Sequence, residues 1–182
     1  APNSTPKLGF LGRLEPRKGV KEFALALNKV LPEFPDWVVE FAGRSMPSCI
    51  SGIDPAQVVR EILGKNLKQV RFLNNLPPSA VLGWFADVDV FAFPSLWDNF
   101  PYVILEAMAS GRSIVATRTG AVPEMLGDTA EIVKPGDVRG LAKALRKLMA
   151  DVDLRVKLGA AARKRFEERF QSDQVMGEIL EV

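Results

Sequence analysis

Residues 88–111 read VDVFAFPSLWDNFPYVILEAMASG: an apolar run, a polar loop and then an apolar segment of helical character. The run from Val88 to Phe93 is nearly continuous in apolar residues, as expected of a parallel strand that helices cover on both faces. Pro101 suits the first turn of the following helix. This stretch therefore predicts one strand–loop–helix unit of a doubly wound α/β domain.

Five further apolar runs, rich in β-branched and aromatic residues, alternate with segments of helical periodicity. The six expected strands cover residues 7–12, 37–43, 69–73, 88–93, 113–117 and 130–133. The expected helices include residues 20–31, a helix that Asp137 caps and that ends near Ala150, and a helix from about Asp153 to Phe170. We therefore expect a Rossmann-like α/β fold with a parallel sheet of about six strands and flanking helices.

Composition limits the chemistry of this domain. The 182 residues are 47% hydrophobic, enough for one substantial core, and the formal net charge is only +2, with the cationic residues spread along the chain. We expect one compact domain over residues 7–182 and no nucleic acid as a partner. The single cysteine, Cys49, and the lack of histidine exclude Ser-His and Cys-His triads and most zinc sites.

The start of the chain, APNSTP over residues 1–6, is typical of an interdomain linker and not of a signal peptide. A chain that begins without Met on such a stretch suggests a piece of a longer protein, with the missing domain on the N-terminal side. No apolar run approaches the roughly 20 residues that span a bilayer, and the one cysteine cannot form an internal disulfide. We therefore expect a cytoplasmic protein.

Ligands of open α/β sheets bind at the carboxyl ends of the strands, so the loops there are informative. The loop after the first expected strand, GRLEPRKG over residues 12–19, is neither a dinucleotide fingerprint nor a Walker A loop. It carries Arg13 and Lys18 before a helix, where a guanidinium and an ammonium can converge on one diphosphate.

The loop and helix after Phe93 carry two carboxylates, Asp98 and Glu106. Free backbone N–H groups near Tyr102 and Val103 would face the strand ends and form an anion site. Glu106, about two turns into the helix, can accept hydrogen bonds from the vicinal hydroxyls of a ribose, and Asp98 can do the same for a sugar.

A third loop, after residues 113–117, contains Gly120, whose conformational freedom would let the backbone approach a ligand closely. Glu124 follows it at an expected helix start. The residues leave open whether Glu124 caps that helix or lines the cleft.

In combination these residues resemble the C-terminal domain of the retaining family 4 glycosyltransferases of GT-B fold. The strongest part is the paired-acid motif of that family, two acids eight residues apart before Ala-Met-Ala-x-Gly, matched by Asp98 and by EAMASG over residues 106–111. The segments 12–19 and 119–124 are similar to the family as well, and the resemblance covers essentially the whole chain.

The resemblance implies a role for each matched residue. Arg13 and Lys18 would bind the diphosphate, Glu106 the ribose hydroxyls and Asp98 the transferred sugar, and these four would carry the catalytic contribution of this domain. Residues 71–75 would border the nucleobase. The full set of expected donor-binding residues is Gly12, Arg13, Lys18, Phe72, Leu73, Asn74, Asp98, Asn99, Phe100, Pro101, Tyr102, Val103 and Glu106.

Two positions depart from the family pattern. Asp98 stands where the family usually has Glu, and its side chain is shorter by about one methylene. Asn99-Phe100-Pro101 replaces Gly-Phe-Gly, and Pro101 removes one backbone N–H that could otherwise face the phosphate or the sugar.

The activity that the resemblance implies is transfer of a hexosyl group from a nucleotide diphosphate sugar with retention of anomeric configuration, in polysaccharide or glycolipid biosynthesis. Fixed cations and a helix start would stabilise the leaving phosphate, so we expect no metal and no other cofactor. Two D-x-D triplets, residues 87–89 and 151–153, match the metal signature of the other major glycosyltransferase fold, but we interpret both as structural.

The acceptor site of such enzymes lies mainly on an N-terminal domain, so this chain is expected to bind the donor and to transfer little or nothing alone. Peripheral membrane association of the full-length enzyme is compatible with these expectations. Uridine, guanosine and adenosine donors all remain open. So do two alternatives, a nucleotide-sugar epimerase of GT-B fold and a non-catalytic nucleotide-binding domain.

Overall fold

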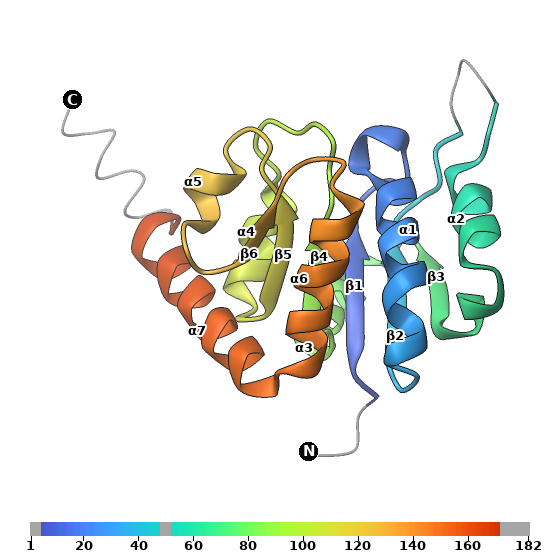
Figure 1. Ribbon diagram of the computed structural model, residues 1–182. Helices are drawn as coiled ribbons and strands as arrows, with labels where there is room; N and C mark the ends of the chain where they lie inside the picture. Colours follow the sequence, from blue (N-terminus) through green and yellow to red (C-terminus); the bar gives the residue numbers. More distant parts are fainter. Residues whose placement is uncertain (1–4, 48–51, 172–182) are drawn as a thin grey trace.

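The computed structural model describes residues 5–47 and 52–171 and contains one six-stranded parallel sheet (Figure 1). All six expected strands are present, each end within two residues of its predicted place. Residues 1–4 of the expected linker, and Cys49, lie outside the described residues. The strands are β1 (Lys7–Leu11), β2 (Val38–Ala42), β3 (Val70–Asn74), β4 (Val90–Phe93), β5 (Ser113–Thr117) and β6 (Glu131–Val133).

The strand order is β3-β2-β1-β4-β5-β6, so the direction of winding reverses between β1 and β4. Both strands run parallel, with Leu8 opposite Val90 and Gly9 opposite Phe91. The chain after β1 leads to a helix on one face of the sheet, and the chain after β4 leads to a helix on the other. Doubly wound folds bind their ligands at such a switch point.

Helices cover both faces of the sheet, as predicted (Figure 1). One face is covered by α1, α2 and α6, and the other by α3 and α4 together with α5 and α7. The helices are α1 (Val20–Val30), α2 (Pro55–Leu63), α3 (Pro78–Asp87), α4 (Tyr102–Ala109), α5 (Val122–Leu126), α6 (Val138–Ala150) and α7 (Val152–Arg169).

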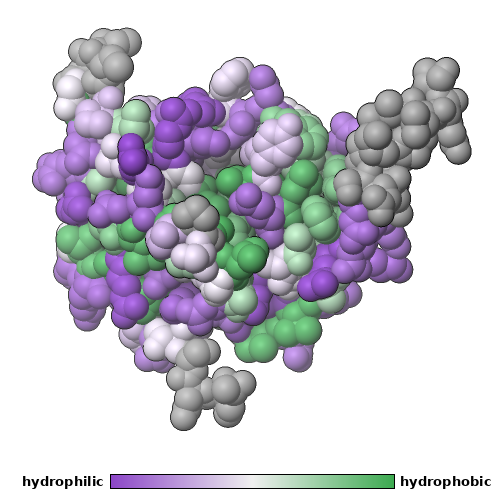
Figure 2. All heavy atoms as spheres, turned by 180° about the vertical axis from the view of Figure 1, so that it is seen from behind, coloured by the Kyte–Doolittle hydropathy of each residue, from purple (hydrophilic) through white to green (hydrophobic). Residues whose placement is uncertain are grey.

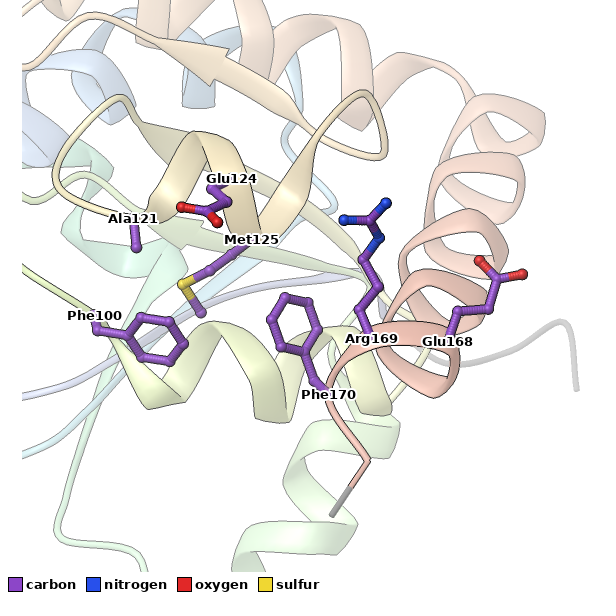
Figure 3. A pocket seen from close by; sticks show the side chains of 7 residues that line it. All are labelled: Phe100, Ala121, Glu124, Met125, Glu168, Arg169 and Phe170. Carbon is purple, nitrogen blue, oxygen red and sulfur yellow. The ribbon is translucent and has the colours of Figure 1, made fainter. Parts of the chain in front are cut away.

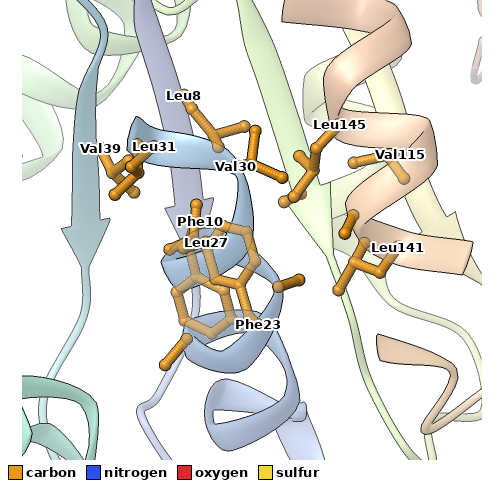
Figure 4. Close-up of a cluster of buried hydrophobic side chains, with 14 of the residues drawn as sticks. Leu8, Phe10, Phe23, Leu27, Val30, Leu31, Val39, Val115, Leu141 and Leu145 are labelled. Atoms are coloured by element: carbon orange, nitrogen blue, oxygen red, sulfur yellow. The ribbon is translucent and has the colours of Figure 1, made fainter. Parts of the chain in front are cut away.

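The core on the first face is built where α1 packs on β1 and α6 packs beside α1 (Figure 4). Phe10 of β1 lies against Phe23 of α1 and Phe41 of β2, with ring centroids 6.1 and 5.5 Å apart. Helix α6 contributes Leu141 and Leu145 to this core. Burial of each such side chain is worth about 1.5–3 kcal/mol, so this contact fixes β1 in the centre of the sheet.

Strand β4 contributes to both cores. Val90 and Ala92 belong to the first, whereas Phe91 and Phe93 belong to the second, with side chains of α3 and α4. The period of two residues along a strand explains this division. All four side chains are buried, which confirms that β4 is covered on both faces.

Three of the four acids in the D-x-D triplets make structural contacts, and Asp153 lies in the first turn of α7. Asp89 accepts from the backbone N–H of Lys7 at 2.7 Å, and Asp87 is paired with the ammonium group of Lys7. Asp151 caps α7 by accepting from the N–H of Leu154 at 2.9 Å. Asp137 caps α6 in the same way, as predicted, by accepting from the N–H of Gly140 at 2.8 Å.

Candidate functional site

The carboxyl ends of β1, β2 and β3 are joined by their first loop residues. Gly12 donates its N–H to Ala42 at 2.9 Å, and Gly43 donates to the carbonyl of Asn74 at 2.6 Å. Asn74 itself has a left-handed φ of 49°. Three loops from distant parts of the sequence thus form one rigid edge.

A pocket of about 350 Å³ opens at this edge, between the ends of β1 and β2 and the first turns of α4. We call it the carboxyl-edge pocket. It brings together four residues that the sequence predicts in the donor site, namely Gly12, Arg13, Val103 and Glu106. Its lining residues are Leu11, Gly12, Arg13, Ala42, Gly43, Arg44, Asn75, Leu76, Val81, Val103 and Glu106.

The carboxyl-edge pocket has two guanidinium groups, from Arg13 and Arg44. The side chain of Arg13 is 56% exposed, and its ion pair with Glu15 is long, at 3.5 Å, so it can turn to an anion. Arg44 was not among the predicted site residues. It directly follows β2 and Gly43, and that place at a carboxyl strand end is the signal that could have found it.

Glu106 supplies the carboxylate of the carboxyl-edge pocket. It reaches the surface, yet the surrounding protein partly desolvates its carboxyl group and so raises the pKa of Glu106. Val103 lies one turn earlier on α4, which starts at Tyr102 with no side-chain cap. The helix therefore presents uncapped N–H groups and a carboxylate along one side, suited to a phosphate and a diol respectively.

Lys18 and Asp98 contact each other, and neither lines the carboxyl-edge pocket, although Lys18 shares the loop after β1 with Arg13. The ammonium nitrogen is 2.5 Å from Oδ2 of Asp98, and the two side chains are 17% and 13% exposed. Oδ1 of Asp98 accepts from the N–H of Asn99 at 3.1 Å. The residue expected on the diphosphate is thus paired with the residue expected on the sugar.

Gly120 packs against the loop that carries Asp98. Its φ is +46°, and a Cβ atom there would lie 2.2 Å from the carbonyl oxygen of Asn99. Ala121 donates its N–H to that same oxygen at 2.8 Å. The close approach expected of Gly120 is therefore made to a neighbouring loop.

The segment expected near the nucleobase is only partly at the pocket. Asn75 lines it, but Phe72, Leu73 and Asn74 are not among its lining residues. Phe72 stacks on Phe41 at 5.3 Å in the first core, and Leu73 packs in the second. Alternation along β3 sends these two side chains into opposite cores.

Pro101 is buried and is the N-cap residue of α4, one residue before the helix, instead of lying within its first turn. Phe100 faces a different pocket of about 520 Å³, where it and Phe170 stand on opposite sides with Met125 between them (Figure 3). Glu124 lines that pocket as well, and α5 has no side-chain cap.

Tyr102 is 73% exposed and meets Phe100 edge to face at 5.5 Å. It lines an apolar pocket of about 580 Å³ between α3, α4 and α7, which Glu106 borders too. Apolar side chains are visible between polar ones on the side of the molecule turned away in Figure 1 (Figure 2). Among the described residues, no group of three His, Cys, Asp or Glu side chains is placed to hold a metal ion.

A match to the family described as Glycosyl transferases group 1 spans residues 1–165, and the chain belongs to this family. It is 35% identical over 165 residues to D-inositol 3-phosphate glycosyltransferase of Corynebacterium jeikeium, covering 88% of this chain and 39% of that protein. It is 32% identical over 177 residues to phosphatidyl-myo-inositol mannosyltransferase of Mycolicibacterium smegmatis, covering 95% and 43%. The chain thus spans less than half the length of these relatives.

Solved structures identify the fold as that of a GT-B C-terminal domain. The C-terminal domain of the glycosyl transferase group 1 protein LpcC from Francisella tularensis superposes with a TM-score of 0.83 at 25% identity, covering 93% of this chain and 88% of that one. Anabaena HepE in complex with UDP gives a TM-score of 0.84 at 22% identity, covering 98% and 48%. Over the described ranges, no helix has the length and apolar content to cross a membrane.

Proposed function

We propose that this chain is the donor-binding domain of a retaining glycosyltransferase that transfers a hexosyl group from a nucleotide diphosphate sugar without a metal ion. The observation that carries the proposal is the carboxyl-edge pocket, which places Arg13 and Glu106 together at the switch point between β1 and β4 of a glycosyl transferases group 1 domain.

In this proposal the diphosphate lies between the Arg13 guanidinium and the uncapped start of α4. Departure of a nucleoside diphosphate develops negative charge on its β-phosphate, and pre-placed cations and helix N–H groups stabilise that charge without rearrangement. Glu106 accepts hydrogen bonds from the ribose hydroxyls. Arg44, which lines the same pocket, is a further cation for the same anion.

The proposal extends to the longer protein. Residues 7–182 form the donor domain, and an N-terminal domain supplies the acceptor site, in keeping with the 39% of its relative that this chain covers. The relative named phosphatidyl-myo-inositol mannosyltransferase supports a role in glycolipid or polysaccharide synthesis. A cytoplasmic location with peripheral membrane association is part of the proposal. The UDP complex of HepE supports a nucleoside diphosphate as ligand and leaves the base open.

Calorimetric titration with UDP, GDP and ADP in the presence of EDTA tests the donor site. One of the three should bind, and Glu106→Ala should weaken it roughly tenfold or more, because a charged hydrogen-bond acceptor is lost. Glu124→Ala, which removes an exposed acid from the pocket of Phe100, is the matched control and should bind as the parent chain does. Binding that survives Glu106→Ala unchanged, or binding of none of the three, contradicts the proposal.

Turnover is tested separately. The 182-residue chain should hydrolyse or transfer sugar from UDP-glucose, GDP-mannose or ADP-glucose at no more than a trace rate, because the acceptor side of the cleft is supplied by another domain. Many turnovers by the isolated chain would show that the division between two domains is incorrect.

A further inference from the structure

The Asp98 side chain has two protein donors, and this distinguishes it from the more exposed Arg13 of the carboxyl-edge pocket. Oδ2 contacts the Lys18 ammonium at 2.5 Å, and Oδ1 accepts from the N–H of Asn99 at 3.1 Å. Its side chain is 13% exposed, against 56% for Arg13. Both carboxylate oxygens therefore already have protein donors.

The two loops that carry this pair are fixed to each other by the backbone. Leu96 donates its N–H to the carbonyl of Arg17 at 2.8 Å. Gly19 has a φ of +67°, and a Cβ atom there would lie 1.9 Å from the carbonyl oxygen of Pro94. The loop after β1 thus lies directly on the loop after β4, with Lys18 and Asp98 at the contact.

The opposite side of the Asp98 loop is fixed as well, by Gly120 and by the hydrogen bond from Ala121 to Asn99. This frame holds the Asp98 carboxylate in place on the Lys18 ammonium group. An ammonium group has three N–H donors, so one can remain on Asp98 while two face phosphate oxygens.

We propose that Asp98 is a positioning residue for the donor diphosphate, which acts by holding the Lys18 ammonium in place. This inference rests on the proposed function. The role can be tested with nucleoside diphosphates that carry no sugar, because Lys18 and Asp98 are proposed to act on the phosphates.

The test is a double-mutant cycle read by calorimetry with whichever of UDP, GDP and ADP binds the parent chain. Asp98→Asn should weaken that nucleoside diphosphate about tenfold, since the charged tether of the ammonium is lost. Asp98→Glu keeps the carboxylate and should restore most of the affinity. In the Lys18→Met background, Asp98→Asn should cause no further loss of affinity, because the ammonium group through which Asp98 is proposed to act is already absent.

Glu131→Gln is the matched control. It removes the carboxylate of another lysine ion pair with the same 2.5 Å separation, between Glu131 and Lys147, away from the site. Thermal unfolding of every variant, followed by circular dichroism, checks that it is folded. Glu131→Gln should bind the nucleoside diphosphate as the parent chain does.

Three results would overturn the inference. The first is that Asp98→Asn binds the nucleoside diphosphate as tightly as the parent chain, or more tightly. The second is that Asp98→Asn lowers the affinity equally in the parent and in the Lys18→Met background. The third is that Asp98→Glu does not recover affinity. Failure of the proposed function looks different, because the parent chain itself would then bind none of the three nucleotides.

Discussion

The carbonyl oxygen of Gly12 lies 2.0 Å from the position that a Cβ atom would take on Gly43. Gly43 has a φ of +141°, a conformation that side chains rarely adopt, and both glycines line the carboxyl-edge pocket. The ends of β1 and β2 are therefore in close contact at the site, and this contact requires that Gly43 has no side chain.

Gly43→Ala should lower the free energy of unfolding by about 2 kcal/mol or more, because backbone strain adds to a steric clash. It should also weaken nucleoside diphosphate binding. Gly136→Ala is the control, since Gly136 has a φ of +74° but no atom within 4 Å of its would-be Cβ, and it should cost only about 1 kcal/mol. Chemical denaturation of both variants measures the difference, and equal losses would contradict the steric account.

Glu40 is a buried carboxylate in the middle of β2, 3% exposed, and it accepts a 2.7 Å hydrogen bond from the indole N–H of Trp84. Trp84→Phe should destabilise the chain by about 3 kcal/mol, because the carboxylate loses a donor and the core loses volume. Urea denaturation measures this. In a Glu40→Gln background the loss should be smaller, and an equal loss there would show that only volume matters.

Glu106 should bind its ligand at a cost to stability. Desolvation raises the pKa of Glu106 in the folded state, so the fold favours the protonated carboxyl group. The contribution of Glu106 to the free energy of unfolding is therefore largest below the unfolded pKa of about 4.3, and it is lost as the pH rises through the folded pKa. Glu106→Gln should therefore melt at a higher temperature than the parent at neutral pH and at the same temperature near pH 4. A parent chain that is the more stable of the two at neutral pH would contradict the desolvation argument.

The D-x-D triplet at residues 151–153 should act on the helix and not on the ligand. Asp151→Ala removes the cap of α7 and should cost about 1 kcal/mol, whereas Asp151→Asn keeps an acceptor and should cost little. Nucleoside diphosphate affinity should be unchanged in both, with Mg²⁺ or with EDTA. A Mg²⁺-dependent affinity that Asp151→Ala abolishes would reverse this assignment.

Much of the fold could be predicted because its signals are local. A run such as β4 is apolar on both faces only when two helical layers cover it, and Asp137 marks a helix start through its own side chain. Because ligands of open α/β sheets bind at the carboxyl ends of the strands, the sequence also predicts that Arg13 and Glu106 lie near each other, as they do in the carboxyl-edge pocket.

What the sequence does not contain is the pairing of distant loops. Lys18 and Asp98 are 80 residues apart, and they meet because β1 and β4 are neighbours in the sheet. The orientation of Phe72 also depends on a register that only the pairing of β3 with β2 sets. Pro101 precedes α4 by one residue because helix ends depend on local backbone geometry.

Chemical-shift mapping of the ¹⁵N-labelled chain with the nucleoside diphosphate that binds it tests the central claim most directly. The largest changes should fall on the amides of Gly12, Arg13, Asn75, Tyr102 and Val103, around the carboxyl-edge pocket and the start of α4. Changes centred instead on Ala121, Glu124 and Met125, in the pocket of Phe100, would contradict the account.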